Sequence, residues 1–97
     1  MKNAKKNIKV AILIIGNEVL SGRTQDLNVK FISHWLNINC GISVDEVRII
    51  PDIEKKIIFN VRDLSKKFKY VFTTGGIGPT HDDITALSIA KAFKIKY

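Results

Sequence analysis

Three short runs rich in β-branched and aromatic residues predict the strands of this chain. They are Lys9–Ile15, Ser43–Ile50 and Lys69–Thr74. The first is rich in β-branched residues and stays apolar up to Gly16, which is typical of a strand buried on both faces of a parallel sheet. The second ends at Pro51, which cannot donate to a sheet ladder. The runs therefore predict three strands of one sheet.

Between and after these strands, apolar residues recur at steps of three and four, the spacing of one helix face. A first helix is predicted from Leu27 to about Asn39, with Gly41 as its C-terminal stop. A second follows Asp52, whose carboxylate is expected to accept hydrogen bonds from the first free amides. A third follows the glycine-rich segment after Thr74. The three apolar stripes are Leu27, Phe31, Ile32, Trp35 and Leu36; Ile53, Ile57, Val61, Leu64 and Phe68; and Ile84, Leu87, Ala90 and Phe93.

The element order is therefore β-α-β-α-β-α, in which helical connections of this length suit parallel strands. Right-handed crossovers place helices on both faces of the sheet. We predict one α/β domain over residues 1–97, a three-layer α/β/α fold with parallel strands in the order 2-1-3. In that order the loops that leave the first and third strands open onto one crevice.

Composition narrows the class of protein. The apolar share of 45% and the charged share of 26% predict an ordinary globular domain. The longest apolar run, Val10–Ile15, is too short to cross a bilayer, and the single Cys40 cannot form an internal disulfide. We therefore expect a cytoplasmic protein with no membrane partner.

The net charge of +7 indicates which kinds of partner the chain could bind. A basic surface attracts nucleic acid, but it suits a phosphorylated small molecule equally well. Nucleic-acid sites interleave aromatic and basic residues, whereas the aromatic residues here mostly fall at apolar helical spacings. We expect a small phosphorylated ligand and no nucleic-acid partner, with non-specific polyanion binding as the alternative.

A glycine-rich segment, TTGGIGPTHDDIT, follows the third strand. Gly75, Gly76 and Gly78 let a ligand approach the main chain, and the amides there, with Thr80 and the start of the next helix, are predicted to bind a phosphate. The alternative is a tight turn in which Thr80 and Asp83 form a capping box. The segment lacks the Gly-Lys-Ser/Thr ending of a P-loop, and it fits the dinucleotide glycine pattern poorly.

Two adjacent carboxylates, Asp82 and Asp83, follow the glycines. Either could simply favour the helix start. Beside an anion site, however, they would repel the ligand unless a cation lies between, and Mg²⁺ takes one or two carboxylates plus phosphate oxygens. We therefore predict that they bind Mg²⁺ and act in catalysis, whereas His81 is expected to be a partly exposed hydrogen-bonding residue.

The loop after the first strand is also polar. Its polar residues could serve only as turn and capping residues, which requires no ligand. If they face the crevice, however, they would bind a polar heterocycle and supply further acids. These residues are Asn17, Glu18, Ser21, Gly22, Thr24, Asp26 and Asn28.

Two segments, IGNEVLSGRTQDLN (residues 15–28) and VFTTGGIGPTHDDIT (residues 71–85), resemble the signatures of the molybdenum-cofactor-biosynthesis, molybdopterin-binding domain family. The likeness is greatest to its competence/damage-inducible (CinA-like) branch, and it extends to the N-terminal domain of eukaryotic FAD synthase. It covers nearly all of residues 8–95. The second signature is highly specific and the first moderately so.

The resemblance implies a three-layer α/β/α fold that binds molybdopterin or a nucleotide across these loops, and assembly as a homo-oligomer, a dimer or trimer. Relatives adenylylate molybdopterin with Mg²⁺, and CinA-type domains split nucleotide pyrophosphates such as ADP-ribose. Asp83 matches the metal-binding, catalytic acid. The glycines at 75, 76 and 78 match the phosphate loop. Ser21, Gly22 and Asp26 match the first loop of the pterin site.

Two departures from the family limit what is carried over. Asn17 stands where many relatives carry Asp, which removes a negative charge. Family domains also continue beyond the position of Tyr97, so we expect a truncated domain. The hypotheses are a Mg²⁺-dependent pyrophosphatase or adenylyltransferase in the complete domain, and a non-catalytic pterin- or nucleotide-binding module or inactive fragment.

Overall fold

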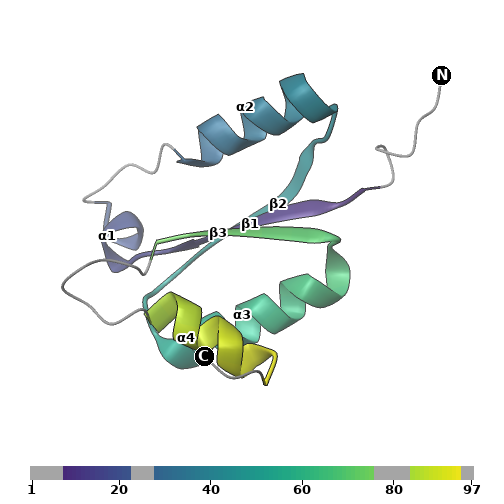
Figure 1. Cartoon of the computed structure of the whole chain (residues 1–97). Helices are drawn as coiled ribbons and strands as arrows, with labels where there is room; N and C mark the ends of the chain where they lie inside the picture. Colours follow the sequence, from purple (N-terminus) through teal and green to yellow (C-terminus); the bar gives the residue numbers. More distant parts are fainter. Residues whose placement is uncertain (1–7, 23–27, 76–83, 95–97) are drawn as a thin grey trace.

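The structure, a computed structural model, describes residues 8–22, 28–75 and 84–94 of the chain. Its elements follow the predicted alternation, with one addition after the first strand. They are β1 (Val10–Ile15), α1 (Asn17–Leu20), α2 (Asn28–Cys40), β2 (Val44–Ile50), α3 (Glu54–Lys67), β3 (Tyr70–Thr74) and α4 (Ile84–Ala92). The strands are parallel in the order β2-β1-β3, with α2 over one face of the sheet and α3 with α4 over the other (Figure 1). The α/β prediction and the strand order are confirmed.

The central strand β1 organises both layers. All six of its residues are buried, as its continuous apolar run predicts. Ala11, Leu13 and Ile15 pack in one core with Leu64 of α3 and Ala92 of α4. Because side chains alternate along a strand, the even-numbered residues face the α2 layer. On that side Val10 packs in a smaller cluster with Leu36 of α2 and with Ile42.

Two helix ends test the predicted helix stop and the predicted helix cap. Gly41 ends α2 with a left-handed φ of 67°, and its amide donates to Asn37 O at 3.1 Å, so the predicted stop is confirmed. The predicted cap at Asp52 is wrong. Ile53 occupies the cap position of α3, and no side chain caps that end. The Asp52 amide instead donates to Asn17 Oδ1, which holds this residue against the loop after β1.

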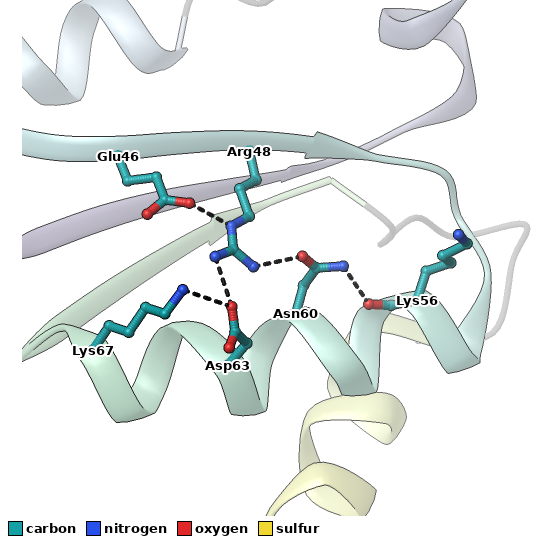
Figure 2. A network of polar contacts seen from close by, with 6 residues as sticks. All are labelled: Glu46, Arg48, Lys56, Asn60, Asp63 and Lys67. Atoms are coloured by element: carbon teal, nitrogen blue, oxygen red, sulfur yellow. Dashed lines mark hydrogen bonds and ion pairs between the residues drawn. The ribbon is translucent and has the colours of Figure 1, made fainter.

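A polar network joins β2 to α3 on the same side of the sheet as the larger core (Figure 2). The Arg48 guanidinium donates to Glu46 Oε2 at 2.6 Å, to Asp63 Oδ2 at 2.7 Å and to Asn60 Oδ1 at 2.9 Å. Lys67 Nζ lies 3.3 Å from the same Asp63 oxygen. Each of the three guanidinium nitrogens thus donates to an oxygen, so this half-buried charge is compensated.

The network makes folding depend on pH. Hydrogen bonds from Arg48, and then from Lys67, hold the pKa of Asp63 below its usual value. A depressed carboxylate pKa stabilises the fold above the unfolded pKa, near 3.9, and this contribution is lost as the pH falls through the folded value. We expect Asp63→Asn to lower the Tm at pH 7, and the difference from wild type to shrink below about pH 4. Circular dichroism melts between pH 2.5 and pH 7 would measure this.

Lys67→Gln provides the control, because it leaves the larger contribution of Arg48 in place. It should keep most of the pH dependence that Asp63→Asn removes. A Tm difference between wild type and Asp63→Asn that is constant from pH 2.5 to pH 7 would contradict the assignment.

Candidate functional site at the carboxyl ends of β1 and β3

The chain leaving β3 passes directly against the end of β1. Ile14 and Thr74 form the last pair of the β1–β3 ladder, and Gly75 follows with a φ of 88°. A Cβ built on Gly75 would lie 1.9 Å from the main-chain oxygen of Ile15. Only glycine has both the conformation and the space for this approach. The two unusual loops of the sequence therefore begin side by side.

The loop after β1 is tied to the end of β2 as well. The Gly16 amide donates to Ile50 O at 3.0 Å, and Asn17 Oδ1 accepts the Asp52 amide at 3.1 Å. The Glu18 carboxylate folds back toward Gly16, since a Cβ there would lie 3.0 Å from Glu18 Oε2. An acidic group and an amide group thus lie at the carboxyl edge of the sheet, where ligands bind in open α/β folds.

The helix α1 was missed by the sequence analysis, which predicted loop throughout. Its single turn is closed by the Leu20 amide on Gly16 O at 3.3 Å and the Ser21 amide on Asn17 O at 2.9 Å. Four residues are too few to show a helical period, so no sequence signal could have revealed it.

Ser21 and Gly22 end this turn. The Ser21 hydroxyl donates to Glu18 O at 3.1 Å. Gly22 has a φ of 82° but open space around its Cα, so its backbone conformation alone favours glycine. Both residues thus form part of the turn, and their role in binding a ligand stays a prediction.

Of the predicted site residues, Gly75, Ser21 and Gly22 lie within the described parts of the chain. The others lie outside them: Asp26, Gly76, Gly78, Thr80, Asp82 and Asp83, together with Thr24 and His81. Residues 8–22, 28–75 and 84–94 contain no group of three or more His, Cys, Asp or Glu side chains that could hold a metal.

Two polar groups at this edge were not singled out as site residues. Thr74 Oγ1 and Asp52 Oδ1 are buried and have no hydrogen-bond partner among the described residues. A buried polar atom left unpaired costs about 1–3 kcal/mol, so a ligand or water that reached either atom would gain a favourable contact. Their positions in the sequence could have indicated them as site residues. Thr74 ends β3 and Asp52 lies just beyond β2, both at the edge of the sheet where ligands bind.

No helix in the described ranges is long and apolar enough to span a bilayer.

Comparison with known proteins gives a family match and a fold match. The profile of a family described as "Probable molybdopterin binding domain" matches residues 11–96. A probable FAD synthase of Caenorhabditis elegans is 42% identical over 83 residues, 86% of this chain and 16% of that protein.

Two solved structures share the fold. A CinA protein of unknown function from Thermoplasma acidophilum superposes with a TM-score of 0.82 at 32% identity, covering 96% of this chain and 53% of that one. The molybdopterin biosynthesis enzyme MoaB of Thermus superposes with a TM-score of 0.77 at 22% identity, covering 87% and 54%. The chain thus spans about half the length of both.

Two glycines with similar φ values test the close approach. Gly22→Ala should cost about 1–2 kcal/mol, the penalty of a left-handed residue in open space. Gly75→Ala carries the same penalty and also forces the ends of β1 and β3 apart, so it should cost at least about twice as much. Urea unfolding of both variants would measure the two losses, and equal losses would contradict the contact.

Proposed function

Because the chain belongs to the molybdopterin-binding domain family, we propose that the carboxyl edge of β1 and β3 binds the phosphate groups of a nucleotide or pterin. This edge would cleave or form a phosphate ester or anhydride. The observation that carries the proposal is the contact of Gly75 with Ile15, which starts the glycine segment beside the polar loop after β1.

The glycine segment supplies the phosphate contacts. It begins at Gly75 and leads to α4, a nine-residue helix that starts at Ile84. Main-chain amides in such a segment donate to phosphate oxygens, and the helix dipole favours negative charge at this end. Thr74 Oγ1, unpaired among the described residues, would be a further donor.

Asp82 and Asp83 would hold the metal in this scheme. Bound Mg²⁺ would supply charge neutralisation at phosphorus. In hydrolysis of ADP-ribose, a water oxygen forms the new bond to phosphorus while the bond to the bridging oxygen breaks, giving AMP and ribose 5-phosphate. In adenylyl transfer, a phosphate oxygen of molybdopterin attacks the α-phosphorus of ATP and pyrophosphate leaves. In both, the glycine amides stabilise charge on the non-bridging oxygens.

The names of similar proteins fit this class of ligand. One relative is a probable FAD synthase, and the Thermus protein of like fold is a molybdopterin biosynthesis enzyme. Both names refer to phosphorylated heterocycles, which agrees with a phosphate site next to a polar loop.

Calorimetry on the 97-residue chain tests binding first. ADP-ribose in the presence of MgCl₂ should bind, and Asp83→Asn should weaken binding about tenfold or more, equivalent to about 1.4 kcal/mol. With EDTA in place of Mg²⁺ wild type should bind no more tightly than Asp83→Asn, because the carboxylate then has no cation to hold and only repels the phosphates.

Glu46→Gln is the matched control, since it removes a carboxylate from the middle of β2, in the Arg48 network. It should leave ADP-ribose affinity unchanged. Phosphorus NMR of the same samples would separate hydrolysis from binding alone. No binding of ADP-ribose or ATP, or equal affinity for wild type and Asp83→Asn with Mg²⁺, would overturn the proposal.

A further inference from the structure

The helix α3 carries a concentration of positive charge. It has five cationic side chains and two acidic ones. Both acids pair with cations of other elements. Glu54 pairs with Lys91 of α4 at 2.7 Å. Asp63 pairs with Arg48 of β2 at 2.7 Å (Figure 2). Of the five cations, only Lys67 pairs with a carboxylate in the described parts of the chain. The other four are Lys55, Lys56, Arg62 and Lys66.

An exposed aromatic ring lies among these cations. Phe59 is 65% exposed and lines a hollow of ≈ 300 Å³ on the surface of α3. The residues of this hollow recur at steps of three and four, on the side of the helix away from the buried Ile57 and Leu64. They are Lys55, Ile58, Phe59, Arg62, Asp63 and Lys66. We call this surface the outer face of α3.

Phe59 departs from the pattern that argued against nucleic acid. Most aromatic residues of the chain fall at apolar helical spacings, and Phe68 packs against the core as that spacing predicts. Phe59 instead alternates with cations along the helix. Lys55 lies four residues before it, Arg62 three after it and Lys66 seven after it. Aromatic and basic side chains interleaved in this way are typical of surfaces that bind single-stranded nucleic acid.

Arg62 is held in place within this stripe. Its Nε donates to Ala92 O at 2.8 Å, and its Nη2 donates to Lys91 O at 3.5 Å. A guanidinium that is fixed before binding loses less conformational entropy when it meets a phosphate. Arg62 and Lys66 are also four residues apart, a spacing at which like charges destabilise a helix. A bound anion would relieve that repulsion.

We propose that the outer face of α3 binds a single strand of nucleic acid, with one base stacked on Phe59 and phosphates beside the cations. From Lys55 to Lys66 the helix rises about 16 Å, which accommodates at most about five nucleotides at 3.4 Å or more each. A single strand offers free base faces for stacking, whereas the bases of a duplex are already stacked. This site is separate from the carboxyl edge of β1 and β3 and does not depend on it.

Charge favours a nucleic acid over a protein segment as the occupant. Lys55, Arg62 and Lys66 have no carboxylate partner among the residues that the structure describes. An apolar segment laid over them would take these charges out of water without compensation. Phosphates would compensate them and release counterions. An acidic peptide would compensate them too, but its carboxylates cannot stack on the ring of Phe59 as a base does.

Fluorescence anisotropy tests the binding on the 97-residue chain. The probes are labelled oligothymidylate and oligouridylate of about 20 nucleotides, longer than the proposed site. Wild type should bind, with an affinity that falls steeply between about 50 and 200 mM salt. Binding of either probe supports the proposal, and the tighter of the two shows which sugar the face prefers.

Two variants separate stacking from charge. Phe59→Ala should weaken binding about tenfold and leave the salt dependence unchanged, because the stacked base is uncharged. Lys66→Gln should lower the slope of log affinity against log salt by about 0.7. Phe31→Ala and Lys30→Gln of α2 are the matched controls, since Phe31 is 68% exposed and Lys30 is an exposed cation next to it. Both should leave affinity and slope as in wild type.

Three results would overturn the proposal. One is that neither probe binds to wild type. Another is that Phe31→Ala weakens binding as much as Phe59→Ala does. The third is that polyglutamate displaces the probe as effectively as unlabelled oligothymidylate, which would assign the outer face of α3 to acidic peptides.

Discussion

The contact between Gly75 and the Ile15 oxygen is the constraint on which the candidate site depends. Parallel strands in the order β2-β1-β3 bring the carboxyl ends of β1 and β3 to one edge. Strand order alone, however, would leave side chains between the main-chain segments that follow β1 and β3. Removing the Cβ at position 75 lets the main chains touch, so the polar loop after β1 and the glycine segment start from one point. The site follows from the sheet together with one residue that lacks a side chain.

The two faces of the sheet are stabilised differently. On the α3 side a continuous core and the Arg48 network combine apolar burial with compensated charge. On the α2 side the cluster is smaller, and Phe31, Trp35 and Ile38 of α2 remain largely exposed. The rigid support of the strand ends therefore comes mainly from α3 and α4.

The sequence predicted most of the fold because few arrangements satisfy it. A six-residue apolar strand must be central, and right-handed crossovers then fix the layers. One failure, the helix α1, came from its four-residue length, and another from a contact between segments distant in the chain. Asp52 has the chemistry of a helix cap, but its amide binds Asn17, 35 residues away, which local pattern cannot reveal. Asp82 and Asp83 lie outside the described residues, so their role remains a prediction from the resemblance and from charge.

β3 links the candidate site to the centre of the sheet. Its last residue, Thr74, directly precedes Gly75. Among the described residues β3 is hydrogen-bonded as a strand only to β1, so the position of Gly75 against Ile15 depends on one ladder. Because a strand held by one ladder opens more readily than a strand held by two, the start of the phosphate segment is restrained by this ladder together with the contact of Gly75 with Ile15.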